Sequence, residues 1–215
     1  MSSDSTSRAS DPKTQKRALR REIVARILAL DPANRRRQEA ELARRFAALP
    51  GLDRATTVLL YVTAFPEEID TRPIIGRVLG SGLRLVCPRV DRARRCLMLH
   101  HVRDLARDLV PGVLGIPEPA PTCPEIAPEA VDWALIPGLG FDRRCYRIGR
   151  GAGHYDRLLP TLRADAPRWA LALDEQWVDC LPIEPHDQRL DGVVSPATVA
   201  LREPVIEGGI PEIPD

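Results

Sequence analysis

A glycine-rich segment in the second half of the chain carries the clearest chemical signal. Residues 137–160 (PGLGFDRRCYRIGRGAGHYDRLLP) leave an apolar run of strand length, pass through a GRGAG turn at 149–153 and enter a stretch with helical spacing. Glycines let a backbone approach a ligand closely, and successive N–H groups at a helix start can point at phosphate oxygens. Arg147 and Arg150 add permanent charge and paired donors. The pattern indicates a phosphate site or a structural turn, because it matches neither the dinucleotide fingerprint nor the Walker loop.

Two acidic residues near this segment could hold a hard cation. Asp156 lies three residues after the last glycine of the turn, and Asp191 precedes the short apolar run 192–194. Mg²⁺ prefers oxygen ligands and keeps several waters, so one or two carboxylates suffice. The same two residues also fit a helix-start carboxylate and a turn residue. Both interpretations stay open from the spacing alone.

Two segments in the first third of the chain could complete such a site. Lys16 and Arg20 are four residues apart, so they share one face of an expected helix, which could clamp a polyphosphate or be solvated surface. The acidic run FPEEID (65–70) follows a run of strand length, at the strand end where α/β sheets bind ligands. Glu68 could there bind a polar, amine-bearing substrate or cap the next helix.

Helices and strands that must position these residues alternate along the chain. Asp11-Pro12 predicts a helix over 13–29, and the next Asp-Pro pair predicts a second helix that stops at Pro50-Gly51. A third helix is predicted over 71–79. Apolar runs predict strands at 57–62, 83–87, 96–102, 133–137, 168–173 and 192–194. Runs without polar alternation are typical of strands covered on both faces, so the predicted fold class is α/β with a mostly parallel sheet.

Length and composition predict the domain organisation. The 215 residues, 44% of them apolar, suit one domain over 13–200, and no apolar run reaches the roughly 18 to 20 residues that cross a bilayer. A disordered tail is expected at 1–12 and a flexible tail at 201–215, because both are polar or rich in proline, glycine and acid. The proline-rich stretch 110–128 is predicted to be an ordered surface loop. Scattered cysteines and no signal sequence predict a cytoplasmic protein.

The charge balance bears on the class of ligand. The chain has 31 basic and 30 acidic residues, and Lys13 and Lys16 are its two lysines. Such a balance argues against a surface built for nucleic acid. A non-catalytic nucleic-acid-binding module remains an alternative, because residues 1–54 are basic and arginines cluster at 92–95. Nine aromatic residues without an aromatic-rich strand argue against base stacking.

Taken in order, these segments resemble the 5-formyltetrahydrofolate cyclo-ligase family, also called methenyltetrahydrofolate synthetases. The matching runs, which span about residues 13 to 195, are KRALR (16–20), EEIDT (67–71), GIPEP (115–119), PGLGFD (137–142), RIGRGAGHYDR (147–157), LALDEQ (171–176) and DGVV (191–194). The resemblance implies a three-layer α/β/α fold and an enzyme that converts 5-formyltetrahydrofolate to 5,10-methenyltetrahydrofolate with Mg-ATP, releasing ADP and phosphate. We expect a reduced folate as partner, no nucleic acid or membrane, and a monomer or weak homodimer.

The resemblance also assigns roles in phosphoryl transfer. A formamide carbonyl is a poor electrophile, so its oxygen would first take the γ-phosphoryl group, giving a phosphorylated formyl intermediate that the neighbouring amine attacks. Such transfer depends on positioning and charge neutralisation rather than on a nucleophilic side chain. Lys16, Arg20 and Arg150 would supply the charge. The residues expected to bind ATP are Lys16, Arg17, Ala18, Leu19, Arg20, Arg147, Ile148, Gly149, Arg150, Gly151, Ala152, Gly153, His154 and Tyr155.

Metal and folate roles follow from the same resemblance. Asp156 with Asp191 would hold Mg²⁺, while Glu68 and Tyr155 would contact the reduced folate.

Four positions depart from the family pattern. Ala152 stands where a third glycine or a lysine is common, His154 where tyrosine is common, and Cys145 where glycine is usual. Val90 stands where some members place an aromatic residue. These departures keep open a paralogue that uses ATP to activate a different pterin or formamide.

Overall fold

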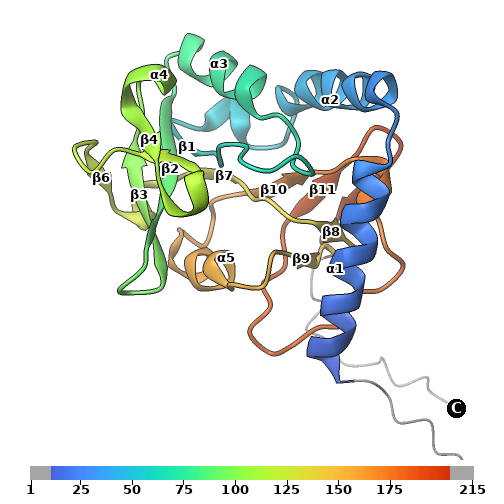
Figure 1. The fold of residues 1–215 in the computed structure, drawn as a ribbon. Coiled ribbons are helices and arrows are strands. Elements are labelled where there is room, and N and C mark those ends of the chain that lie inside the picture. The colour runs from blue at the N-terminus through green and yellow to red at the C-terminus, as the bar shows by residue number, and fades with distance from the viewer. Residues whose placement is uncertain (1–10, 204–215) are drawn as a thin grey trace, which may run out of the picture.

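An eight-stranded sheet forms the centre of the molecule in the computed structural model, which describes residues 11–203 (Figure 1). The strand order is β12-β11-β10-β7-β1-β2-β3-β6. Five central strands run parallel: β1 (Thr57–Leu59), β2 (Arg84–Asp91), β7 (Trp133–Leu135), β10 (Arg168–Leu171) and β11 (Gly192–Val194). The antiparallel strands are β3 (Cys96–His101), β6 (Glu125–Ile126) and β12 (Val199–Leu201). The predicted mostly parallel sheet is confirmed.

Three helices cover one face of the sheet. They are α1 (Pro12–Leu28), α2 (Pro32–Phe46) and α3 (Arg72–Gly80), close to the predicted ranges. Asp31 caps α2, because its carboxylate accepts hydrogen bonds from the two backbone N–H groups at 33 and 34. Ile23, Leu42 and Ile75 bring the three helices into one buried cluster with the strands. The apolar face of each helix therefore fixes its place on the sheet.

The second face carries a thinner layer. It contains the hairpin β8 (Gly140–Phe141) and β9 (Arg147–Ile148), then α5 (His154–Leu158) and the short 3₁₀ helix η4 (Leu159–Thr161). Phe141, Leu158 and Leu159 are buried in a cluster with strand residues of the same face. Both faces are thus covered, which confirms the expected α/β class with three layers.

The proline-rich stretch differs from its prediction. Instead of an ordered loop without strands, β4 (Leu109–Pro111) and β5 (Pro117–Pro119) form an antiparallel hairpin, and β6 joins the main sheet. Proline is tolerated in edge strands, where one side of the backbone needs no partner. The remaining short helices are η1 (Leu52–Arg54), α4 (Leu105–Asp108), η2 (Val113–Gly115), η3 (Pro128–Ala130) and η5 (Asp174–Gln176).

The expected tails fall mostly outside the described residues. Of the stretch 1–12 the structure describes only 11 and 12, where α1 begins, and of 201–215 only 201–203, where β12 ends.

The turn between β8 and β9 holds a non-glycine residue in the left-handed region. Cys145 has φ 64° and is fully buried. The buried Asp142 holds this turn by accepting from the backbone N–H groups of Arg144 and Tyr146 and by pairing with the Arg144 guanidinium at 2.6 Å. Burial raises the pKa of the Cys145 thiol to about 11. The thiol is therefore protonated at neutral pH, as a structural residue would be.

Gly192 marks a place where the sheet leaves no room for a side chain. A Cβ at this position would lie 2.2 Å from the indole ring of Trp169 on the paired strand β10. We expect Gly192→Ala to lower the free energy of unfolding by about 1–3 kcal/mol, because overpacking displaces neighbours. Urea unfolding measures the change. Gly76→Ala in α3, where nothing lies within 4 Å, is the control and should be stabilising; equal losses in both variants would contradict the packing argument.

Candidate active site

A pocket of about 430 Å³ opens where the central parallel strands end. Tyr61 and Val62 enter it just after β1, and Pro137 enters it just after β7. The carboxyl edge of a parallel sheet is where α/β folds bind ligands, and the volume suits a small molecule. Residues of α1, of the glycine turn and of segment 184–187 close the pocket from the other sides.

One part of the pocket gathers the lysine and arginine side chains, with the acidic Asp156, Glu184 and Asp187 beside them. Its basic lining residues are Lys13, Lys16, Arg20, Arg147 and Arg150. Both lysines of the chain are in this set. Lys16 and Arg20 come from one face of α1, as the four-residue spacing predicted, and Arg20 donates from Nε to the carbonyl of Gly149 at 2.7 Å. This contact ties α1 to the glycine turn.

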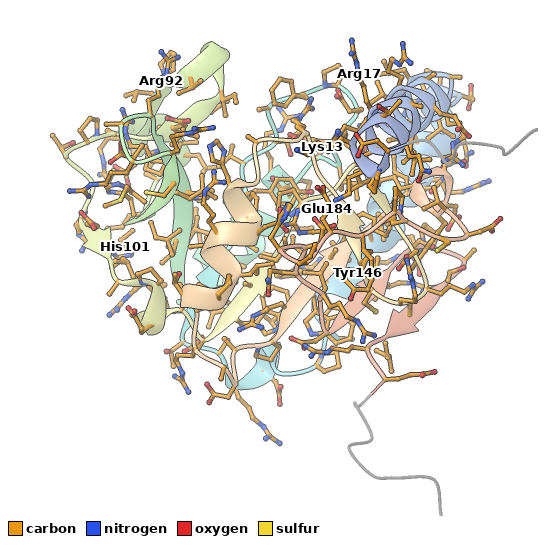
Figure 2. All side chains as sticks on the ribbon, turned by 90° about the horizontal axis from the view of Figure 1, so that it is seen from below. Lys13, Arg17, Arg92, His101, Tyr146 and Glu184 are labelled. Atoms are coloured by element: carbon orange, nitrogen blue, oxygen red, sulfur yellow. The ribbon has the colours of Figure 1, made fainter. Side chains whose placement is uncertain are left out.

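Three residues expected at the nucleotide lie elsewhere. Arg17, Ala18 and Leu19 are not among the residues that line the pocket. Arg17 and Ala18 are exposed, and Leu19 packs against the core under the helix. Figure 2 shows Arg17 on the outer side of α1 and Lys13 nearer to Glu184. A helix presents only residues three or four apart on one face, so the continuous run 16–20 was too broad a prediction.

The glycine turn has the backbone that the sequence suggested. Gly151 and Gly153 have φ values of 102° and 65°, a region that side chains rarely adopt, and Ala152 between them does not share it. All nine residues from 147 to 155 line the pocket. The alanine that departs from the family pattern is therefore accommodated without backbone strain.

Arg147 has an unsatisfied donor at the wall of the pocket. Its side chain is 4% exposed, its Nη2 donates to Asp156 at 2.8 Å, and its guanidinium lies 5.6 Å from the centre of the Tyr155 ring. Its buried Nε has no hydrogen-bond partner within residues 11–203. Burial lowers the Arg147 pKa. The Asp156 carboxylate partly opposes this shift, because it favours the charged guanidinium. An orphaned donor among five cations fits the phosphates of a nucleotide.

Lys16 pairs with two acidic residues that sequence reasoning missed. Its buried Nζ donates to Glu184 at 2.9 Å and to Asp187 at 2.5 Å. Burial acts to lower the Lys16 pKa, but the hydrogen bonds to Asp187 and Glu184 outweigh it and raise the pKa overall. The segment IEPHD (183–187) gives no local signal of this pairing, because the pairing forms only when the fold brings together residues 168 positions apart.

The expected metal pair is not brought together. Asp191 precedes β11, at the amino end of a parallel strand and outside the pocket lining. Its carboxylate accepts from the backbone N–H of Arg168 at 2.8 Å and lies 3.8 Å from Arg202. The prediction of Asp191 as a metal ligand is therefore wrong in position, because the amino and carboxyl ends of a strand lie at opposite edges of the sheet.

Asp187, rather than Asp191, lines the pocket together with Asp156. Asp156 lines the pocket and accepts from the backbone N–H of Gln188 at 3.4 Å, so the loop that carries Asp187 lies beside Asp156. Oxygen or nitrogen ligand atoms of Glu184, His186 and Asp187 lie within 4.8 Å of one another. The chemistry of this donor set, mainly carboxylate oxygens, fits Mg²⁺.

The other part of the pocket can receive an amine-bearing ring system. Glu68 lines it, and its Oε2 accepts from the backbone N–H groups of Ala64 and Phe65 at 2.8 and 3.3 Å. Tyr155 also lines it, and burial raises its phenol pKa, so the hydroxyl stays protonated. Apolar lining is supplied by Tyr61, Val62, Ile69, Pro88, Val90, Leu97, Ile116 and Pro117. Val90 thus contributes to the apolar wall as an aliphatic residue.

His154 does not introduce charge into the pocket at neutral pH. Burial is the main cause that lowers its pKa below 6.5, and the nearby Arg157 and Arg95 act in the same direction. The imidazole therefore stays neutral at pH 7.

Comparison with known proteins identifies the family. A sequence profile of the 5-formyltetrahydrofolate cyclo-ligase family matches residues 12–196. The chain belongs to the 5-formyltetrahydrofolate cyclo-ligase family. The cyclo-ligase of Escherichia coli K12 is 30% identical over 181 residues, which cover 82% of this chain and 98% of the relative. That of Mycolicibacterium smegmatis is 35% identical over 153 residues, which cover 68% and 77%.

The fold of this cyclo-ligase family member also matches a solved structure. The NMR structure of Aquifex aeolicus 5,10-methenyltetrahydrofolate synthetase has a TM-score of 0.77 and 27% identity, covering 92% of this chain and 97% of the other. Family membership makes the chain an enzyme of the ligase class, a cyclo-ligase. Within residues 11–203, no helix is both long and apolar enough to cross a membrane.

The Lys16 pair should be visible in the pH dependence of stability. The hydrogen bond from Lys16 holds the pKa of Glu184 below its ordinary 4.5, so this carboxylate stabilises the fold above that pH and the contribution is lost as the pH falls below it. The Lys16 pKa, raised above 10.5, keeps the ammonium charged throughout. We expect urea midpoints of the wild type to fall more steeply from about pH 5 to pH 3 than those of Glu184→Gln. Equal slopes would show that the pair contributes no stability.

Proposed function

We propose that this cyclo-ligase converts 5-formyltetrahydrofolate to 5,10-methenyltetrahydrofolate, with Mg-ATP as cosubstrate and with release of ADP and phosphate. The observation that carries the proposal is one pocket with two chemically distinct parts. The five cations and the glycine turn come from α1 and from β9 with the residues after it, whereas the apolar lining comes mainly from β2, β3, β5 and the residues after β1, where Glu68 also lies. A phosphoryl donor and a reduced folate can therefore meet in the same cavity.

The cationic part would hold the triphosphate. Lys16 and Arg20 approach from α1, while Arg147 and Arg150 approach from the turn, so positive charge surrounds the phosphates from two directions. Phosphoryl transfer depends chiefly on in-line positioning and charge neutralisation in a water-poor site. The buried Nε of Arg147 supplies a donor that no other described residue uses.

Asp156 and Asp187 would hold Mg²⁺ beside these phosphates, with Glu184 next to them. The ion would supply further charge neutralisation at the transferring phosphoryl group. Lys16, which pairs with Asp187 and Glu184 here, would turn its ammonium toward the phosphates when these carboxylates bind the ion.

The apolar part would bind the folate. Glu68 presents a carboxylate that can accept from the N–H groups of a pterin, and Tyr61 and Val90 are among the walls against which its rings can pack. This arrangement would direct the formyl oxygen toward the γ-phosphate. After transfer, the neighbouring amine nitrogen forms a bond to the formyl carbon, loses its proton and expels phosphate, which closes the ring.

A single assay tests the proposal. Purified protein with Mg-ATP and 5-formyltetrahydrofolate should produce the absorbance of the methenyl product and one ADP per product. Folded protein that gives no product would contradict the proposal. ADP release that depends on a different pterin or formamide would support the paralogue instead. We also expect a cytoplasmic protein that is a monomer or weak homodimer, which sedimentation can check.

A further inference from the structure

Glu67 lies next to the predicted folate contact but does not line the pocket. Its side chain is 8% exposed, and its Oε1 accepts from Nη2 of Arg150 at 2.8 Å. Arg150 itself does line the pocket, within the glycine turn. Glu67 therefore reaches the pocket only through the guanidinium that it holds.

Arg150 is fixed by three neighbouring residues of a single loop. Besides its bond to Glu67, its Nε lies 3.5 Å from Oε1 of Glu68, and its guanidinium stacks on Phe65 at 3.4 Å from the ring centre. This loop follows β1, whereas Arg150 follows β9, so the ion pair joins segments 83 residues apart. These contacts hold the glycine turn against the loop that carries Glu68.

The contacts leave Arg150 able to act on phosphate. Nη2 and Nε serve the two carboxylates, and a guanidinium has five N–H donors in one plane, so donors remain for an anion in the pocket. The buried carboxylate of Glu67 fixes the plane of the Arg150 guanidinium. The same guanidinium would then touch phosphate on one side and the folate-binding Glu68 on the other.

We infer that Glu67 is a positioning residue that aims Arg150 for phosphoryl transfer and couples the nucleotide and folate parts of the pocket. The inference rests on the proposed function and adds to it a residue that touches neither substrate. Misplacing a group that acts in the transfer by about 1 Å can lower a rate by about 100-fold. Loss of the Glu67 contact should therefore lower kcat more than it weakens nucleotide binding.

Kinetics of Glu67→Gln provide the first test. We expect kcat to fall by about tenfold or more, while the Kd for Mg-ADP changes by less than about threefold because Lys16, Arg20 and Arg147 remain. Glu67→Asp keeps the charge and should recover part of kcat. The control is Glu41→Gln, which removes an ion pair with Arg45 on α2 and should keep the wild-type kcat. A wild-type kcat in Glu67→Gln, or equal losses in kcat and nucleotide affinity, would overturn the inference.

A double-mutant cycle with Arg150→Gln provides the second test. If Glu67 acts through Arg150, the double variant should be no slower than Arg150→Gln alone. It should also unfold at a higher urea concentration than Arg150→Gln, which leaves the Glu67 carboxylate buried without its cation. Rate losses that multiply would overturn the inference. The stability cycle and Mg-ADP binding need no turnover, so failure of the proposed reaction in the wild type remains distinguishable from failure of the Glu67–Arg150 coupling.

Discussion

Lys16→Ala should lower kcat/KM for the cyclo-ligase reaction by about 10²–10³-fold, the usual cost of removing one preorganised donor from a developing charge. The structure gives a reason to expect the upper end of this range. The substitution removes a buried ammonium at the phosphates and also leaves Glu184 and Asp187 without the cation that they pair with in the absence of Mg²⁺. Steady-state kinetics, with circular dichroism to show that the variant is folded, measure the effect.

Lys16→Arg separates charge from shape. A guanidinium keeps the positive charge, but it is planar and larger than the ammonium that fits this buried position. We expect a rate between those of the wild type and Lys16→Ala. Arg21→Ala, an exposed position on the same helix, is the matched control and should keep the wild-type rate. A normal rate in Lys16→Ala would mean that Lys16 does not act on the phosphates.

Asp156→Asn and Asp187→Asn should each raise the Mg²⁺ concentration needed for half-maximal turnover and lower kcat by about 10²-fold or more, because the ion contributes several kcal/mol to the transition state. Asparagine keeps the size of each side chain and one acceptor oxygen. The Asp156 variant can therefore still accept the hydrogen bond from Arg147, although this buried guanidinium loses its charged partner. A titration of initial rate against Mg²⁺ measures both quantities.

Asp191→Asn is the informative control for the metal assignment. It weakens the contacts of Asp191 with Arg168 and Arg202 at the start of β11, so a loss of stability is expected. Its Mg²⁺ dependence should match the wild type. If Asp191→Asn raised the Mg²⁺ requirement while Asp187→Asn did not, the two acids would have to exchange their assigned roles.

Local sequence signals predicted the elements of this fold well. Asp-Pro pairs start α1 and α2, and each of the six apolar runs contains a strand of the main sheet. The hairpin of β4 and β5 escaped prediction because strands of three residues that contain proline have no periodicity to detect. The short strand β12 also escaped prediction, because three residues show no periodicity and the strand depends on pairing with β11.

The candidate site was predictable from separate local segments, which include Lys16, Arg20 and Glu68 as well as the glycine turn. Arg147, Arg150 and Asp156 belong to one continuous segment whose glycines reveal its shape. Glu184 and Asp187 can be recognised as site residues only from their contacts with Lys16, which lies near the other end of the chain. Spacing also could not tell which end of a strand an acid occupies, so Asp191 was placed at the wrong edge of the sheet.

The contact between α1 and the loop at 184–187 sets the order in which the enzyme can become competent during synthesis. Lys16 meets its partners across 168 and 171 residues, so a ribosome must have released most of the chain before the clamp can close. Contacts of such long range form late and at an entropic cost. Until then, Lys16 on α1 lacks its two carboxylate partners, and the growing polypeptide has no complete cavity in which to bind and hydrolyse nucleotide.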